Sequence, residues 1–468
     1  MKQNSRASWS GQLAFVLAAA ASAIGLGNLW RFPYLAAKYG GGVFIAAYLF
    51  LSLTLGFTLL ITEIALGRYS RQSQLTAFRK LGHPRWNFLG ILATIVPLVI
   101  LPYYNVIGGW VVRYFASYVK CAFAGGELPA NPDAFFQSFI AADFAPFVCM
   151  LIFTVVVTAV ILMGVKNGIE KSNLFMMPIL FVMAIGIAVY VSTLPGSGAG
   201  IRYYLVPDFS GCDNFGKVIL GAMGQMFYSL SLAMGIMITY GSYMRRQNSI
   251  ASASVRIVAA DTIVAVLSGF IIIPVVVIFA AGSGGAGGKV AIEAGPGLMF
   301  QTLPKVFSSF GAAGVWVGLV FFTLVLFAAL TSSISMTETC VASICDFFHI
   351  KRKPSTLAVA VWSILLGSVS AFGYGRWKAF QPFGMPALDF FDFSMNSVLM
   401  PIVAALTCVF IGWVLTPKRI LAECGRNGCS TGFKGFYIVM VKYFAPILVI
   451  AILVSEICRI LKIGGWSI

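Results

Sequence analysis

The sequence predicts an all-helical integral membrane protein with eleven membrane-spanning helices, and three observations lead to that fold class. Hydrophobic residues make up 59% of the 468 residues, charged residues make up only 10%, and the mean hydropathy is +0.91. Soluble domains of this length carry more charge. Eleven apolar segments each reach the ~20 residues that a helix needs to cross a bilayer. Two of them are interrupted by glycine and polar residues at corresponding places.

The expected spans follow from the apolar segments in chain order. They lie near residues 11–37, 41–66, 87–119, 143–164, 172–194, 216–244, 255–281, 311–345, 355–373, 394–416 and 436–461. The first segment is too long for the apolar part of a signal peptide and carries a polar interruption, so we expect it to remain as a span. The intervening loops are too short for a soluble domain. Residues 1–468 are therefore expected to form one membrane domain.

The first span is interrupted at residues 22–33, Ser-Ala-Ile-Gly-Leu-Gly-Asn-Leu-Trp-Arg-Phe-Pro. Gly25 and Gly27 are poor helix formers. Asn28 and Arg31 are polar groups that are costly at membrane depth. A helix broken here frees backbone carbonyls for an ion or a solute, as in the discontinuous helices of many secondary transporters.

The sixth span is interrupted at residues 224–235, Gly-Gln-Met-Phe-Tyr-Ser-Leu-Ser-Leu-Ala-Met-Gly. Spans 1 and 6 each begin a set of five, and because five is odd the second set starts from the opposite side of the membrane. We therefore expect an inverted repeat of 11–194 and 216–416, with 436–461 as an eleventh helix. A glycine kink for close helix packing is the alternative for either interruption alone. The paired positions favour a binding site.

The formal net charge of +17 is explained by topology rather than by a nucleic-acid partner. Loops on one side of the expected spans carry more than twice as many Lys and Arg residues as loops on the other. The positive-inside rule then places the N-terminus in the cytoplasm, and an odd number of spans places the C-terminus outside. Nine scattered Cys residues show no zinc-ligand spacing, and Cys424 and Cys429 fall in an expected cytoplasmic loop where disulfides are rare.

Several longer motifs resemble those of the neurotransmitter:sodium symporters. They are Ala-Ile-Gly-Leu-Gly-Asn-Leu-Trp-Arg-Phe-Pro (23–33), Tyr-Gly-Gly-Gly (39–42), Glu-Ile-Ala-Leu-Gly-Arg (63–68), Tyr-Tyr-Asn-Val-Ile-Gly-Gly-Trp (103–110), the 224–235 segment, Thr-Tyr-Gly-Ser-Tyr (239–243), Leu-Thr-Ser-Ser (330–333) and Leu-Asp-Phe-Phe-Asp-Phe (388–393). The similarity runs from Trp9 to about Thr416. It implies a sodium-driven importer on the bacterial leucine-transporter fold, working by alternating access in the bacterial inner membrane as a monomer or weak homodimer.

The resemblance implies two sodium sites. The first would use the Ala23 carbonyl, Asn28, Ser229, Asp261 and the carboxylate of the substrate. The second would use the carbonyls of Ala21, Ile24 and Ala328 with the hydroxyls of Thr331 and Ser332. For these two hydroxyls alone, the alternative is a hydrogen bond back to their own helix.

The resemblance also implies that chloride is not required. Chloride-dependent relatives have Asn at the position of Asp261 and Ser at that of Ala265, whereas this chain supplies a carboxylate. Tyr48, Gln225 and Ser229 match the remaining positions of the chloride site. An intramembrane carboxylate needs a partner, and Na⁺ would serve. The alternative is an Asp near water at the end of span 7.

The substrate implied by the resemblance is a zwitterionic amino acid, because amine-transporting relatives have Asp where this chain has Gly25. The contacts it implies come from Ser22, Ala23, Leu26, Gly27, Ile100, Tyr104, Phe227, Tyr228, Ser229, Ser231, Met234, Ser332 and Met336. The carboxylate would meet the amides near Leu26 and Gly27, where a half-helix N-terminus favours anions. Met234 stands where the leucine transporter has Phe, which points to a larger, aromatic side chain. Ordinary packing is the alternative for each Met.

The family pattern further implies two gates. Arg31, Asp392, Tyr104 and Tyr228 would close the site from outside. Arg6, Trp9, Tyr243 and Asp346 would close it from the cytoplasm. Exposed ion pairs contribute only about 0–1 kcal/mol, which suits a gate that opens in each cycle. Glu63 and Arg68 are expected to be structural, at the inner end of span 2.

Other functional classes are less consistent with these residues. A non-transporting amino-acid sensor on this fold would keep the pocket but need not keep both sodium sites and both gates. A symporter for a different small zwitterion would keep all of them. A channel needs a continuous polar pore, and an enzyme needs a nucleophile–base or metal constellation that the sequence does not present.

Overall fold

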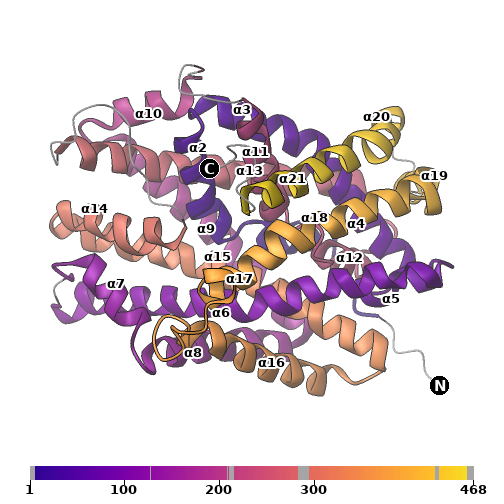
Figure 1. The fold of residues 1–468 in the computed structure, drawn as a ribbon, viewed down its shortest axis with the longest axis horizontal. Coiled ribbons are helices and arrows are strands. Elements are labelled where there is room, and N and C mark those ends of the chain that lie inside the picture. The colour runs from indigo at the N-terminus through magenta and orange to yellow at the C-terminus, as the bar shows by residue number, and fades with distance from the viewer. Residues whose placement is uncertain are drawn as a thin grey trace.

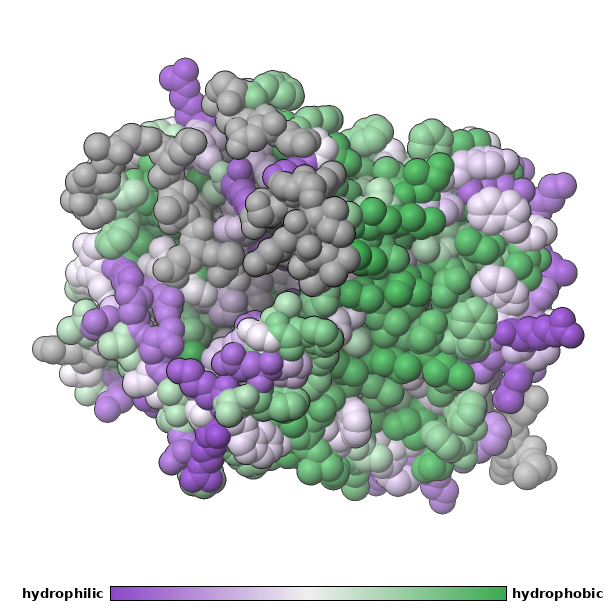
Figure 2. Space-filling view, in the orientation of Figure 1, coloured by the Kyte–Doolittle hydropathy of each residue, from purple (hydrophilic) through white to green (hydrophobic). Residues whose placement is uncertain are grey.

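The computed structural model describes residues 6–126, 128–207, 209, 215–282, 295–426 and 432–460. These residues are helical apart from their connections and one isolated β-bridge between Gly41 and Pro207. Most helices run along the long axis of the molecule (Figure 1). An apolar belt crosses the visible face, with hydrophilic residues at both ends of that axis (Figure 2). This is the surface of a protein that spans a bilayer, and the all-helical membrane fold is confirmed.

Nine continuous helical stretches in the described residues are long and apolar enough to cross a membrane. They are Gly42–Ser70, Pro84–Ala124, Ala145–Leu162, Val165–Ser192, Ile250–Ala280, Ala312–Phe348, Arg352–Phe372, Ala387–Leu415 and Lys434–Cys458. A tenth span consists of Gln12–Ala23 and Gly27–Lys38, which are bent by 54° at their break. The predicted interruption of the first span is therefore present.

The α-helices that form these spans, and the sixth span described below, have the following bounds. They are α1 (Gln12–Ala23), α2 (Phe32–Lys38), α3 (Gly42–Leu51), α4 (Phe57–Ser70), α6 (Asn87–Ala124), α8 (Ala145–Leu162), α9 (Lys171–Ser192), α11 (Phe215–Ser229), α12 (Ile236–Ser242), α13 (Ile250–Gly282), α15 (Ala312–Phe348), α16 (Arg352–Phe372), α17 (Ala387–Asp392), α18 (Met400–Val409), α20 (Lys434–Val439) and α21 (Ala445–Ile460).

Shorter helical elements connect or extend the spans. The connecting helices are α5 (Gln74–Lys80), α7 (Pro132–Ile140), α10 (Ser197–Leu205), α14 (Leu303–Ser309) and α19 (Pro417–Gly425). Stretches of π-helix lie at Gly27–Arg31, Ser52–Gly56, Val165–Glu170, Leu298–Thr302, Phe393–Leu399, Phe410–Leu415 and Met440–Phe444, and 3₁₀ turns at Pro84–Trp86 and Pro382–Gly384. Single π-helical turns inside α-helices are often found at functional sites.

The sixth expected span, 216–244, is divided in the structure. Its helices α11 and α12 are separated by residues 230–235, which are not helical. Neither half alone is long enough to cross a membrane. The largest boundary differences from the sequence prediction are at the fifth span, which begins at Val165 rather than 172, and at the tenth, which begins at Ala387 rather than 394. The residues added to the fifth span form a π-helical stretch, and those added to the tenth form α17.

Helices α4 and α12 cross with their backbones in contact. A Cβ atom at Gly67 would lie 1.9 Å from the carbonyl oxygen of Ile238, and one at Gly241 would lie 2.4 Å from that of Ile64. Only glycine fits at these positions, as is common where membrane helices approach closely. The crossing fixes α12 against α4 on the side of the molecule that carries Arg6, called here the N-terminal face.

A buried ion pair anchors the end of α4. Arg68 Nε lies 2.8 Å from Glu423 Oε1 in α19, with side-chain exposures of 0% and 2%. The guanidinium also donates to the carbonyl oxygen of Asn248 at 2.6 Å. A buried pair of this kind is costly to break, because removing one partner leaves the other charge without compensation. These contacts support the structural role expected for Arg68.

We expect Gly67→Ala to destabilise the protein, because the added methyl group must push α12 away from α4. Overpacking of this kind typically costs about 1–3 kcal/mol. The measurement is the thermal unfolding temperature in detergent. Gly186→Ala is the matched control, since a Cβ at Gly186 in α9 meets nothing within 4 Å. An unfolding temperature for Gly67→Ala equal to that of the control would contradict the close crossing.

Candidate functional site

The two helix breaks meet in the middle of the molecule. Helix α1 ends at Ala23, and Ile24 then takes an extended conformation with φ −78° and ψ 100°. The Ser231 hydroxyl in the 230–235 segment donates to the carbonyl oxygen of Ser22 at 2.9 Å, which ties the two breaks together. Broken helices leave backbone groups unpaired, and within a membrane such groups are tolerated only where protein or an internal cavity satisfies them.

The 230–235 segment is strained and is held by a buried carboxylate. Ser231, Ala233 and Gly235 have φ values of 52°, 60° and 70°. The first two are uncommon for residues with a side chain, and such strain is concentrated at functional sites. Glu63 of α4 accepts a hydrogen bond from the Ala233 amide at 2.7 Å. The structural role predicted for Glu63 is thus to satisfy the backbone of the broken helix.

A small cavity lies between the breaks. Its lining consists of Ser22, Ala23, Gly25, Leu26, Gly27, Asn28, Ile100, Tyr104, Tyr228, Ser231, Met234, Ile236, Ser332 and Met336. The centre of a water-sized sphere can occupy a volume of about 30 Å³ within this cavity. Most of the predicted substrate contacts are therefore together around one space. Ser229 points to Asp261 instead, and Phe227 lines a second cavity beside Arg31 and Asn396.

The glycines of the first break set the shape of this cavity. A Cβ at Gly25 would lie 2.7 Å from Ser332 Oγ and 3.3 Å from the Tyr104 hydroxyl oxygen. A Cβ at Gly27 would lie 2.3 Å from the ring of Tyr228. Any side chain at these positions displaces the cavity wall, so the absence of a carboxylate at position 25 is built into the packing of the site.

Asp261 is the centre of the residues predicted for the first sodium site. Its carboxylate is buried and accepts hydrogen bonds from Asn28 Nδ2 at 2.8 Å, Ser229 Oγ at 2.7 Å and Tyr48 Oη at 2.8 Å. The Asn28 amide oxygen accepts from the Gly25 amide at 3.1 Å. Rotating the Asn28 side-chain amide by 180° would exchange its nitrogen and oxygen and place the amide oxygen beside the Asp261 carboxylate. The structure therefore brings together the side chains predicted for this site.

The hydroxyls predicted for the second sodium site behave differently from one another. Thr331 Oγ1 donates to the carbonyl oxygens of Phe327 and Ala328, each at 3.0 Å, within its own helix. Ser332 Oγ lies 3.4 Å from the carbonyl oxygens of both Ser22 and Ile24 across the break in α1. Ser332 therefore joins α15 to the first break, while Thr331 takes the alternative of bonding back to its own helix.

Of the residues predicted for the outer gate, Tyr104 and Tyr228 line the cavity, and Arg31 and Asp392 make separate contacts. The Arg31 guanidinium lies 5.6 Å from the centre of the Tyr228 ring, and that ring packs on Gly27. Asp392 accepts hydrogen bonds from Tyr103 Oη at 3.0 Å and Asn396 Nδ2 at 2.7 Å. The salt bridges among the described residues do not include an Arg31–Asp392 pair.

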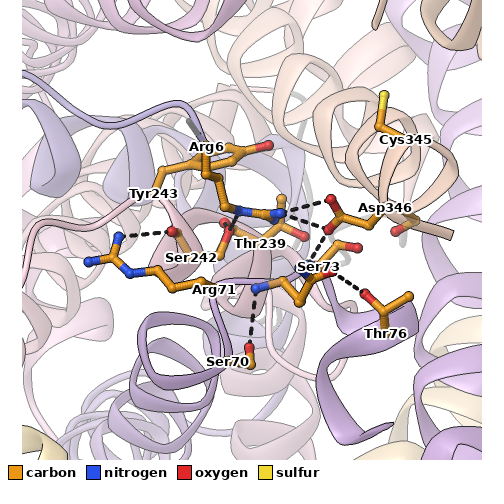
Figure 3. A network of polar contacts seen from close by, with 12 residues as sticks. Arg6, Ser70, Arg71, Ser73, Thr76, Thr239, Ser242, Tyr243, Cys345 and Asp346 are labelled. Carbon is orange, nitrogen blue, oxygen red and sulfur yellow. Dashed lines mark hydrogen bonds and ion pairs between the residues drawn. The ribbon is translucent and has the colours of Figure 1, made fainter. Parts of the chain in front are cut away.

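The predicted inner gate is assembled on the N-terminal face (Figure 3). Arg6 Nη1 lies 2.8 and 2.9 Å from the two carboxylate oxygens of Asp346, and Arg6 Nε donates to Ser242 Oγ at 2.9 Å. Trp9 is fully buried, and its indole nitrogen donates to the Tyr240 carbonyl oxygen at 3.1 Å. The Tyr243 ring lies 5.1 Å from the Arg6 guanidinium carbon. These contacts hold the predicted inner-gate residues together on the N-terminal face.

Sequence reasoning missed several residues of this region. Ile236 lines the cavity as the residue after Gly235, and a pattern search for polar groups cannot find it. Gln74 in α5 accepts a hydrogen bond from Thr239 of α12. Glu338 pairs with Arg352 and accepts from Tyr243 Oη at 2.7 Å. A carboxylate within a membrane span is costly, so the position of Glu338 inside the eighth expected span could have marked it as a residue with a role. Gln74 falls between the second and third expected spans, where the sequence shows no distinguishing pattern.

Comparisons with known proteins agree with this geometry. The model of the sodium:neurotransmitter symporter family matches residues 6–127 and 142–465. The sodium-dependent transporter YhdH of Bacillus subtilis is 33% identical over 461 residues, covering 98% of this chain and 99% of that protein. The human sodium- and chloride-dependent GABA transporter 2 is 27% identical over 453 residues, covering 88% of this chain and 74% of that protein.

A solved structure shares the whole fold. MhsT in complex with L-phenylalanine superposes with a TM-score of 0.85 at 33% sequence identity, covering 96% of this chain and 100% of MhsT. The match of the family model covers well over half of the chain, and the close bacterial relative covers nearly all of it. The chain therefore belongs to the sodium:neurotransmitter symporter family, and it is a sodium-dependent membrane transporter.

Proposed function

We propose that this transporter couples the entry of two sodium ions to the uptake of a hydrophobic, aromatic L-amino acid by alternating access, without chloride. The observation that carries the proposal is the cavity between the two helix breaks. Its described lining offers backbone groups, five hydroxyls, the Asn28 amide and apolar side chains, and none of the lining residues is acidic. A substrate that brings its own carboxylate would complete this site, whereas an amine would lack a counter-charge.

The substrate would be oriented by the two ends of the cavity. The Leu26 amide lies 3.5 Å from the Tyr104 hydroxyl, and both would turn to a carboxylate placed between them. The Ser231 and Ser332 hydroxyls approach the carbonyl oxygen of Ser22, the Ser22 hydroxyl donates to that of Ser231, and this group would lie near the ammonium group. This arrangement leaves the substrate side chain facing the apolar part of the lining.

That apolar part can adapt to a large side chain. It consists of Ile100, Tyr228, Met234, Ile236 and Met336. The free space of about 30 Å³ is enough for only a few water molecules, so an aromatic ring has to move these residues. Methionine is flexible and makes favourable contacts with aromatic rings. MhsT, which has the same fold, was solved with L-phenylalanine.

Sodium would bind where oxygen atoms already converge. At the first site, Na⁺ would take the place of the Asn28 amide nitrogen beside Asp261 and Ser229, with the carbonyl of Ala23 and the substrate carboxylate. At the second, Ser332 Oγ and the Ile24 carbonyl already face each other, and Thr331 would turn from its own helix, with the carbonyls of Ala21 and Ala328. Hard cations prefer oxygen ligands of these kinds.

The proposed topology places the N-terminal face in the cytoplasm, following the excess of Lys and Arg in its loops. Arg6, Trp9, Tyr243 and Asp346 are then the inner gate, and Arg31, Tyr104, Tyr228 and Asp392 the outer one. We further propose that 11–194 and 216–416 are the inverted repeats. An amino-acid sensor would use the same pocket, but it would not need a closed pathway on both sides.

The test of the proposed function is uptake of a panel of radiolabelled L-amino acids into proteoliposomes, with Na⁺ or with choline outside. We expect uptake of Phe, Tyr or Trp only with an inward sodium gradient. Sodium-dependent binding without uptake would favour the sensor. Uptake of amines or of polar amino acids in preference to aromatic ones would contradict the proposed substrate.

We expect Thr331→Ala combined with Ser332→Ala to abolish sodium-dependent substrate binding, because it removes two of the five proposed ligands of the second site. The measurement is equilibrium binding of labelled phenylalanine against sodium concentration. The matched control is Thr337→Ala combined with Thr339→Ala, which removes two buried hydroxyls that donate only to their own helix α15. An unchanged sodium half-saturation in the first double variant would refute the assignment.

We expect Met234→Phe to shift preference toward smaller aliphatic side chains, because the ring fills the apolar part of the cavity. Changes of fit on this scale alter discrimination by ~1–3 kcal/mol. The measurement is the ratio of inhibition constants for phenylalanine and valine in competition uptake, which cancels differences in the amount of folded protein. An unchanged ratio would place Met234 outside the substrate contacts.

We expect wild-type uptake to be the same in chloride and in gluconate, because Asp261 provides the negative charge that an anion supplies in relatives with Asn. Asp261→Asn should be nearly inactive, and chloride rescue should also require Ala265→Ser. Tyr48→Phe is the control, since it removes one hydrogen bond to Asp261 and keeps the charge. It should remain chloride-independent. Loss of wild-type uptake in gluconate would overturn this prediction.

A further inference from the structure

Residues 71–74, the loop after α4 together with the first residue of α5, contact α12 at two points. Gln74 Oε1 accepts a hydrogen bond from Thr239 Oγ1 at 2.8 Å. Arg71 Nη1 donates to the carbonyl oxygen of Ser242 at 3.3 Å, a contact drawn in Figure 3. The segment thus holds both the middle and the end of a helix that has only seven residues.

Gln74 also reaches the wall of the central cavity. Its side chain is fully buried, and a Cβ placed on Gly235 would lie 2.5 Å from both Cγ and Cδ of Gln74. Gly235 stands between Met234 and Ile236, and both of these line the cavity. A change in the conformation of the cavity wall at this point therefore displaces the Gln74 side chain.

Ser73, the residue before Gln74, connects the same segment to the Arg6–Asp346 ion pair. The Ser73 backbone amide donates to Asp346 Oδ2 at 2.6 Å, and Asp346 is the partner of Arg6. Helix α5 itself packs against α6 and α15, which form the opposite wall of the cavity. Two consecutive residues, Ser73 and Gln74, therefore link the Arg6–Asp346 pair to the broken helix.

We propose that Gln74 is a positioning residue that makes closure of the N-terminal face depend on the conformation of the cavity wall. With the wall in the arrangement seen here, Gln74 seats between Gly235 and Thr239, and Ser73 then holds Asp346 toward Arg6. When the cavity wall changes conformation, the Gln74 side chain is displaced from α12, and Asp346 loses the hydrogen bond from the Ser73 amide. This inference rests on the proposed function, because it assumes that the N-terminal face opens during transport.

The contact is built to be released. Gln74 Nε2 is buried without a hydrogen-bond partner among the described residues, so the side chain is held on α12 by one hydrogen bond and by packing. An unpaired buried amide disfavours the seated state and offsets part of what the hydrogen bond contributes. A fully satisfied side chain would hold the face closed more firmly than a reversible cycle allows.

The test is hydrogen–deuterium exchange of the peptide that contains 236–242, in the full-length protein in NaCl and in KCl. We expect Gln74→Ala to speed exchange of this peptide in NaCl by about 2- to 10-fold, the range for loss of one hydrogen bond. Thr239→Val removes the same hydrogen bond from the other side and should shift exchange in the same direction. Gln72→Ala is the matched control, because the Gln72 side chain accepts a hydrogen bond from Thr76 of α5 and has no hydrogen bond to α12 among the described residues.

A double variant separates coupling from a local structural role. If Gln74 also positions Asp346 for Arg6, Gln74→Ala and Asp346→Asn together should speed exchange by less than the product of their separate effects. Multiplicative effects of the two changes would overturn the proposal, as would wild-type exchange in both Gln74→Ala and Thr239→Val. Faster exchange in all helices alike would also overturn it, since that result indicates general destabilisation.

The same measurements distinguish this inference from the proposed function. Equal exchange of the wild-type peptide in NaCl and KCl would count against sodium-linked closure. The comparison of Gln74→Ala with Gln72→Ala can still be made in either salt, and it decides the role of Gln74 independently.

Discussion

The structure depends on one constraint: a backbone interrupted within the membrane must have its polar groups satisfied by the protein. Both breaks leave such groups, and the residues around them supply what the helices no longer provide. Glu63 accepts from Ala233, Ser231 donates to Ser22, and Asn28 accepts from Gly25. The cavity exists because these contacts satisfy part of the freed backbone and leave the remainder for a bound ion or solute.

The same constraint explains why charge is concentrated where it is. Asp261 is buried, and its carboxylate accepts hydrogen bonds from three donors. These donors stabilise the negative charge of a carboxylate, whereas a neutral amide would not require them. Arg6 and Asp346 form the corresponding pair on the N-terminal face. At the residues predicted for the outer gate, Arg31 lies over the Tyr228 ring and Asp392 accepts hydrogen bonds from Tyr103 and Asn396. The residues predicted for the two gates are therefore held by different kinds of contact.

The fold and much of the site could be predicted from the sequence because apolar length and misplaced polar residues are local properties. Gly25, Gly27 and Asn28 mark the first break, and the family pattern then supplied the partners from distant helices. What could not be predicted depends on packing. Which of its two alternatives Thr331 takes, the placement of Phe227 away from the main cavity and the insertion of Gln74 beside Gly235 are decided by side-chain geometry, which no residue pattern encodes.

The two attachments of α4 to the broken helix have a mechanical consequence. Glu63 of α4 holds the 230–235 segment, and Gly67, one turn further along α4, lies against the backbone of α12. Helix α4, the 230–235 segment and α12 are therefore joined as a single rigid lever. Helix α5, the next element of the chain, packs against α6 and α15 and reaches the broken helix through Gln74. Any rotation of the lever relative to those helices then displaces Gln74 from α12 or is absorbed by the backbone dihedral angles of residues 71–73, where Arg71 already has φ of 56°.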